Sequence, residues 1–206
     1  MNTTRRFQFL MLLLLAFVFT GCDELFEDTT LKADSFNGKL TVKVENGAAY
    51  NSQISKVWVL FEADVTDLGQ LTGRIATECK YADGGFTVDL PAISAQFLMN
   101  IQTFFTTVLN VSGELDYSEP DARLMDVDFF AISSDNNFVD FFLYAGTGAK
   151  SSIGYFVYVD SDVTVKGGTN IAVMLKKGWN RIYVSSEKVV SNPPAGMKWY
   201  LYSDVK

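Results

Sequence analysis

Carboxylates are the side chains of this sequence best suited to acid–base chemistry, because the chain contains no histidine. Without histidine, Ser–His and Cys–His nucleophile pairs, an imidazole general base and His-ligated zinc or haem are excluded. Two carboxylates can act as the acid and the base of glycoside hydrolysis. The candidates are Glu62, Glu78, Glu114 and Glu119. No spacing pairs any two of them, so we predict that the protein is not an enzyme and keep a carboxylate-dependent glycan hydrolase as the alternative.

Aromatic side chains offer a second chemistry, because an apolar ring with a polar edge can stack on a sugar. The chain has nine tyrosines and three tryptophans, Trp58, Trp179 and Trp199. We take the three tryptophans as candidate ligand-binding residues. Burial in the core is the competing interpretation for Trp179 and Trp199, because both lie in strand-like runs whose alternation can bury them.

Oxygen ligands for a cation occur in two short runs, Asp160-Ser161-Asp162 and Asp135-Asn136-Asn137. Neither run has the glycine and the terminal glutamate of the twelve-residue calcium loop. The run 146–150 lacks the spacing of a phosphate-binding P-loop. We therefore predict no metal site and no cofactor.

The composition is that of an acidic globular chain. Its 206 residues are 48% apolar, which is enough for a real core, and the length suggests one folded domain. The net charge is −7. An acidic chain binds a phosphate backbone poorly, so we predict that nucleic acid is not a partner.

The N-terminus has the features of a secretory signal peptide. Arg5 and Arg6 precede an unbroken apolar run over 9–19, which is too short to span a membrane and has the length of a signal-peptide core. The small residues before Cys22 resemble the lipobox of bacterial lipoproteins. This resemblance implies a signal peptide over 1–21 and a lipid on Cys22, which would anchor the protein in the membrane. Removal of 1–21 leaves 15 Lys and Arg against 24 Asp and Glu, a net charge of −9.

An acidic run follows the anchor, with four acids in the six residues 23–28. This run resembles the export tag of Bacteroidota-type surface lipoproteins, and it implies outer-membrane localisation with display at the cell surface. A plain acidic linker is the alternative. The triplet Asp28-Thr29-Thr30 also resembles an O-glycosylation motif of that group, with Thr29 as the acceptor. Acylation of Cys22 would leave Cys79 without a disulfide partner, and we predict that Cys79 is a packed thiol.

Period-two alternation of apolar residues dominates the remainder, which we divide into a tether over 22–35 and one domain over 36–206. Turn-forming residues separate about eleven predicted strands, which favours an all-β antiparallel β-sandwich. The predicted strands are 39–45, 56–63, 73–80, 86–90, 123–132, 138–145, 153–160, 163–166, 170–176, 179–185 and 198–203.

One segment departs from this alternation. Apolar residues recur at helical spacing over 93–109, with Ser94 as the candidate cap. Thr103, Thr106 and Thr107 are poor helix formers, so we expect one short helical insertion whose phenylalanines face the core.

Two family resemblances rest on longer stretches. The pieces Gly38-Lys-Leu-Thr-Val-Lys-Val44 and Gly84-Gly-Phe-Thr-Val-Asp-Leu-Pro91 resemble the opening of prealbumin-like and carboxypeptidase-regulatory-like β-sandwich modules. The stretches 155–167, 175–183 and 194–200 are similar to an uncharacterised family of small Bacteroidota-type surface lipoproteins. Together with the two N-terminal pieces, this second resemblance spans most of the mature chain, and it implies no activity.

These observations predict a lipid-anchored, surface-exposed module with a binding or structural role. Its ligand would be a glycan or a protein. A glycan hydrolase and an envelope assembly component that faces the periplasm are the two alternatives.

Overall fold

The fold is all-β with one short helical insertion, as predicted. The computed structural model describes residues 31–65, 71–133, 135, 137–145 and 151–201, and it describes the backbone alone at 63–65, 140 and 142. Its strands are β1 (Asp34–Phe36), β2 (Lys39–Lys43), β3 (Ile54–Val65), β4 (Leu71–Ala82), β5 (Gly85–Asp89), β6 (Met99–Asn100), β7 (Asp116–Tyr117), β8 (Arg123–Ser133), β9 (Phe138–Ala145), β10 (Ser152–Val159), β11 (Val163–Gly167), β12 (Ile171–Leu175), β13 (Gly178–Ser185), β14 (Val189–Val190) and β15 (Lys198–Leu201).

All eleven predicted strands are present, and their described ends lie within two residues of the predicted ones. The structure adds β1, β6, β7 and β14, which are only two or three residues long. A run this short shows no measurable alternation, so these strands could not be predicted from apolar spacing. The pairing between these strands is antiparallel except for β12 with β14, which agrees with the prediction of a mostly antiparallel arrangement.

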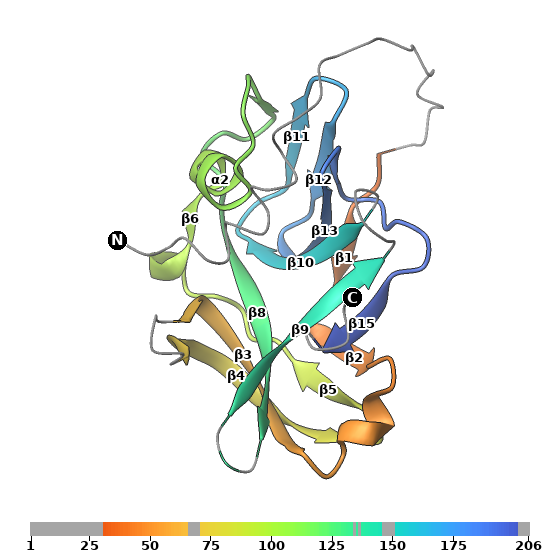
Figure 1. Cartoon of the computed structure of the whole chain (residues 1–206). Coiled ribbons are helices and arrows are strands. Elements are labelled where there is room, and N and C mark those ends of the chain that lie inside the picture. Colours follow the sequence, from red (N-terminus) through yellow and green to blue (C-terminus); the bar gives the residue numbers. More distant parts are fainter. Residues whose placement is uncertain (1–30, 66–70, 134, 136, 146–150, 202–206) are drawn as a thin grey trace.

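The strands form one connected, folded-over sheet in the order β2-β5-β4-β3-β8-β9-β10-β13-β14-β12-β11-β7 (Figure 1). β4 joins the two layers of the sandwich, because it pairs with β3 along its length and with β5 only at Tyr81 and Ala82. The turn between β4 and β5 places Asp83 and Gly84 at positive φ. Two successive residues at positive φ match the twist of a tight hairpin.

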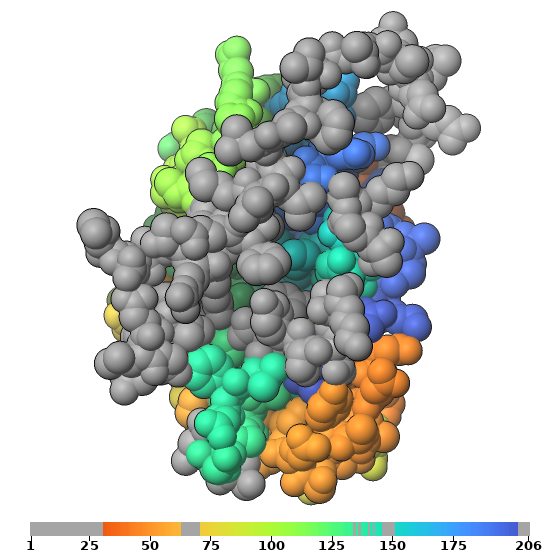
Figure 2. Space-filling view, viewed as in Figure 1, coloured from red at the N-terminus to blue at the C-terminus, as the bar shows by residue number. Residues whose placement is uncertain are grey.

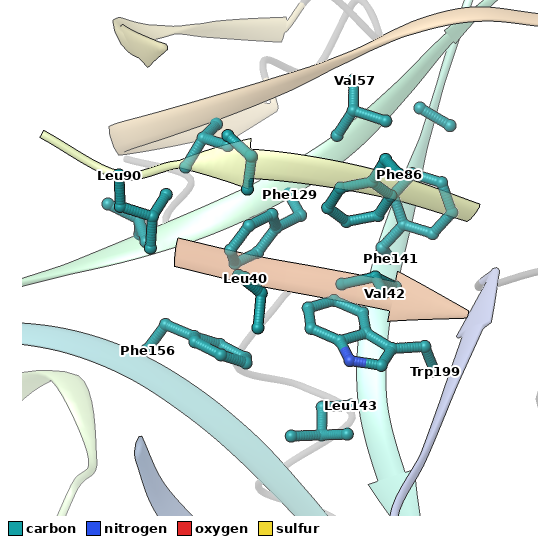
Figure 3. Packing of buried hydrophobic residues seen from close by; sticks show 14 of the residues in the cluster. Leu40, Val42, Val57, Phe86, Leu90, Phe129, Phe141, Leu143, Phe156 and Trp199 are labelled. Carbon is teal, nitrogen blue, oxygen red and sulfur yellow. The ribbon is translucent and has the colours of Figure 1, made fainter. Parts of the chain in front are cut away.

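The largest core fills the space between these two layers. Leu40 and Val42 of β2 and Val57 of β3 belong to it, and aromatic side chains fill the centre. Figure 3 shows that these rings come from β5, β8, β9, β10 and β15 and point toward one another. They belong to Phe86, Phe129, Phe141, Phe156 and Trp199.

The helical insertion packs against a different part of the sheet, where it covers the other face of β10 and β13 and one face of β11 and β12. α2 (Ile101–Thr103) continues into η3 (Phe104–Val108), a π-helical turn, and a separate 3-10 turn, η2 (Ala95–Phe97), precedes them. Ile101, Phe104 and Phe105 have no exposed surface and form a second core with β10, β11, β12 and β13. The prediction that these phenylalanines face the core is confirmed.

The predicted cap of the helix was wrong. Ser94 precedes η2 and makes no side-chain cap, whereas the Asn100 side chain accepts a hydrogen bond from the Gln102 amide at 2.8 Å. The Thr106 and Thr107 hydroxyls donate to carbonyls of the preceding turn at 2.8 and 2.6 Å. Such bonds compete with the regular helical ladder, and they account for a helix of little more than two turns.

The two ends of the described part are formed by different segments. The helical insertion and the loop after it lie at one end, in light green in Figure 2. The orange region at the other end contains η1 (Gly47–Tyr50) and the residues beside it. β1 lies next to β13, so the start of the described chain is fixed to its C-terminal third.

Candidate functional site

The two carboxylate candidates in strands are each engaged by a cation. Glu62 accepts a hydrogen bond from Arg74 Nε at 2.8 Å, and Glu78 accepts from Trp58 Nε1 at 3.0 Å and from Lys56 Nζ at 3.3 Å. The hydrogen bond from Trp58 is the main reason that the pKa of Glu78 lies below its usual range. The hydrogen bond from Lys56 and the positive charge of Lys56 lower this pKa further. A general acid of a glycosidase needs the opposite shift.

The other two candidates, Glu114 and Glu119, are exposed in the loop between η3 and β8. Neither lines the two surface hollows that are described below. The structure therefore does not gather the four candidate carboxylates into a catalytic pair within the part of the chain it describes.

The three tryptophans have different surroundings. Trp179 and Trp199 are 4% and 8% exposed, and their ring faces pack inside the main core. Neither ring is open to a sugar, so as ligand platforms these two predictions were wrong. Trp58 is half-buried, with Lys56 Nζ 4.9 Å from its ring centroid, and it is the one tryptophan with ring surface toward solvent.

The two cation-ligand runs serve local structure. Asp160 accepts from the Arg123 amide at 2.8 Å, and Asp162 accepts from the Lys177 amide at 2.8 Å. Asp135 accepts from the Ser133 hydroxyl and the Asn137 amide group inside one turn. Within the described residues no group of three or more acidic or cysteine side chains is placed to hold a metal ion.

Cys79 is a half-buried thiol in β4. Burial, with a smaller contribution from the charge of Glu78, raises its pKa to about 11. A thiol with so high a pKa carries little thiolate at neutral pH and is a poor nucleophile. This environment agrees with a packed thiol.

Residues 32–36 form a strap that ties the start of the described chain to the body. β1 pairs with β13, and the Asp34 carboxylate accepts hydrogen bonds from Arg181 Nη2 at 2.8 Å and from the Tyr183 hydroxyl. The Ser191 hydroxyl donates to the Lys32 carbonyl at 2.8 Å. Residues 32–35, assigned to the tether from the sequence, are therefore part of the fold.

The strap makes a measurable contribution to stability. We expect Asp34→Asn to lower the free energy of unfolding by about 1–2 kcal/mol, because it removes one partner of a half-buried ion pair whose side chains are 16% and 31% exposed. Urea unfolding measures the change. Glu45→Gln is the control, because its pair with Lys198 is exposed and should cost less than about 0.5 kcal/mol. Equal effects of the two substitutions would contradict a special role for the strap.

One hollow is lined by residues of β10, β13, β14 and the chain beside them, among them the Tyr183 that bonds the strap. This β13–β14 hollow has a volume of about 320 Å³. Its lining residues are Ser152, Tyr183, Ser185, Glu187, Lys188, Val190 and Pro194. Tyr183 is 2% exposed, and burial together with the bond to Asp34 raises the pKa of its hydroxyl, so the group is neutral.

A second hollow, of about 380 Å³, lies beside η1. Small residues and backbone make up most of its lining, and Lys43 Nζ donates to the Asp83 carbonyl at 2.6 Å. It offers few side chains for recognition. The β13–β14 hollow is therefore the better candidate site, and sequence reasoning missed it because its residues share no motif.

Two predicted sites, Cys22 and Thr29, lie outside the described residues. In the part of the chain that is described, no helix has the length and hydropathy needed to cross a bilayer. Comparisons with protein-family models, with curated proteins and with solved structures found no match in any of the three. The family resemblances of the sequence therefore stay predictions.

Proposed function

We propose that this protein is a lipid-anchored module of the outer membrane that is displayed at the cell surface and binds a ligand there. The observation that carries the proposal is the N-terminal sequence, in which a charged start, an apolar run of 11 residues and Gly21-Cys22 occur in register. Several acyl chains on one cysteine hold a protein firmly in a membrane, because each buried CH₂ contributes about 0.8 kcal/mol.

The folded part supports binding over hydrolysis. Glu62 and Glu78 each form an ion pair with a neighbouring cation, Arg74 and Lys56. The lowered pKa of Glu78 agrees with an ionised partner in such a pair. The β13–β14 hollow, in contrast, offers several polar side chains around a small space. Concave sites with a few fixed polar groups are the usual form of ligand sites.

Surface display predicts that an added protease will remove the protein from intact cells. The acidic run over 23–28 is the feature that supports this orientation. The measurement is immunoblotting of intact and of permeabilised cells after proteolysis, with a periplasmic protein as the control for intactness. A protein that is degraded only after the outer membrane is opened would face the periplasm, and the envelope-assembly alternative would replace surface display.

A further inference from the structure

Hydrogen bonds hold two of the side chains that line the β13–β14 hollow, Tyr183 and Ser185. Antiparallel pairing of β10 with β13 places Ser152 directly opposite Ser185, so both hydroxyls lie on one face of the sheet. The Ser185 Oγ accepts hydrogen bonds from the Glu187 amide at 3.3 Å and from the Lys188 amide at 3.0 Å. The strap holds Tyr183 through Asp34. Side chains held in this way lose little conformational entropy on binding, so these two form a prepared part of the wall.

The charges around the hollow favour a neutral ligand. Glu187 and Lys188 are both exposed side chains that line it, one a carboxylate and one an ammonium group. For a small ion of either sign, one of the two groups attracts and the other repels. For two neighbouring hydroxyls both groups are useful, because one hydroxyl donates to the carboxylate while the other accepts from the ammonium.

The remaining lining fits the same class of ligand. Val190 and Pro194 are partly buried and add apolar surface to the hollow, while Ser152 adds a hydroxyl that can both donate and accept. A pyranose ring has an apolar C–H face and a rim of hydroxyls. About 320 Å³ lies at the lower end of the size range of ligand sites, which suits one sugar unit.

We propose that the β13–β14 hollow binds one neutral sugar unit of a glycan. This inference rests on the proposed binding function and assigns its ligand class. Glu187 and Lys188 hold a pair of neighbouring hydroxyls, Ser152 bonds a third polar group, and Val190 and Pro194 contact the apolar face of the ring.

The test uses the full lipoprotein in micelles of a detergent without a sugar head group. The probes are the methyl glycosides of glucose, galactose, mannose and N-acetylglucosamine, and saturation-transfer NMR detects binding. We expect at least one glycoside to bind. Glu187→Gln should then weaken binding at least about tenfold, because it removes a hydrogen bond to a charged group. Ser152→Ala should weaken it less. Glu114→Gln is the matched control, since it neutralises an exposed carboxylate in a different loop, and it should leave binding unchanged.

Four results would overturn the inference, and a thermal unfolding midpoint equal to the parent's excludes misfolding as their cause. They are the absence of binding by every glycoside, binding that Glu187→Gln and Ser152→Ala leave unchanged, equal losses with Glu114→Gln, and displacement of the glycoside by inorganic phosphate. If the protein binds no glycoside but is retained on an array of host proteins, the proposed binding function stands and the assignment of a sugar ligand is wrong. If it binds neither, both proposals are wrong.

Discussion

Replacement of Phe129 by alanine should lower the free energy of unfolding by about 3–5 kcal/mol. This range is typical of a large aromatic side chain removed from a core that cannot close the cavity. Phe129 is 3% exposed, and its ring centroid lies 5.1 Å from that of Phe156 and 5.2 Å from that of Trp199. The loss includes these edge-to-face contacts, each worth about 0.5–1.5 kcal/mol beyond burial.

Urea unfolding followed by tryptophan fluorescence measures this change. Ile75→Ala is the control, because Ile75 is 52% exposed on β4 and its truncation should cost less than about 1 kcal/mol. Domains are stable by only about 5–15 kcal/mol, so Phe129→Ala should bring the protein close to unfolding at ambient temperature. A loss below about 1.5 kcal/mol would mean that the two layers do not pack around this ring.

Gly85→Ala should also be strongly destabilising. We expect it to lower the free energy of unfolding by about 3 kcal/mol or more. A Cβ atom at Gly85 would lie 2.0 Å from the Val42 carbonyl oxygen. This oxygen belongs to the backbone of β2, so the clash cannot be relieved by rotating a side chain. We expect β2 and β5 to separate where Val42 pairs with Phe86, which would open the main core.

Gly168→Ala is the matched control for this substitution. Its Cβ would meet nothing within 4 Å, and the only cost is the positive φ of 52° at that position, about 1–2 kcal/mol. The thermal unfolding midpoint measures both variants. If Gly85→Ala were no worse than Gly168→Ala, the close approach of β2 and β5 would be contradicted.

The alternation of apolar residues was sufficient to locate the long strands. Rows such as Leu40/Val42 and Val127/Phe129 face one core because side chains repeat every two residues in a strand, and a shift by one residue would expose the whole row. The helical insertion was equally visible, since its apolar spacing differs from that of a strand. Its π-helical turn was not, because such a turn is defined by backbone bonds like that from the Leu109 amide to the Phe104 carbonyl, which apolar spacing does not encode.

The candidate site could not have been predicted in the same way. Ser152 and Ser185 lie 33 positions apart in the sequence, and they become neighbours only through the register of β10 with β13. The strap is a similar case, because Asp34 meets Arg181 and Tyr183 across about 150 residues. For the tryptophans, residue type alone suggested contact with a ligand. Two of the three, in β13 and β15, are instead buried by the alternation of those strands.

Mass spectrometry of the N-terminal peptide tests the proposed lipid anchor. The protein would be purified from the membranes of cells that express the full chain, with Cys22→Ser as the comparison. We predict that the mature chain begins at Cys22 and that this cysteine carries a diacylglyceryl group on its sulfur, while the Cys22→Ser protein carries no lipid. An N-terminus at any other residue, or an unmodified Cys22 thiol in the membrane-bound protein, would contradict the lipid anchor.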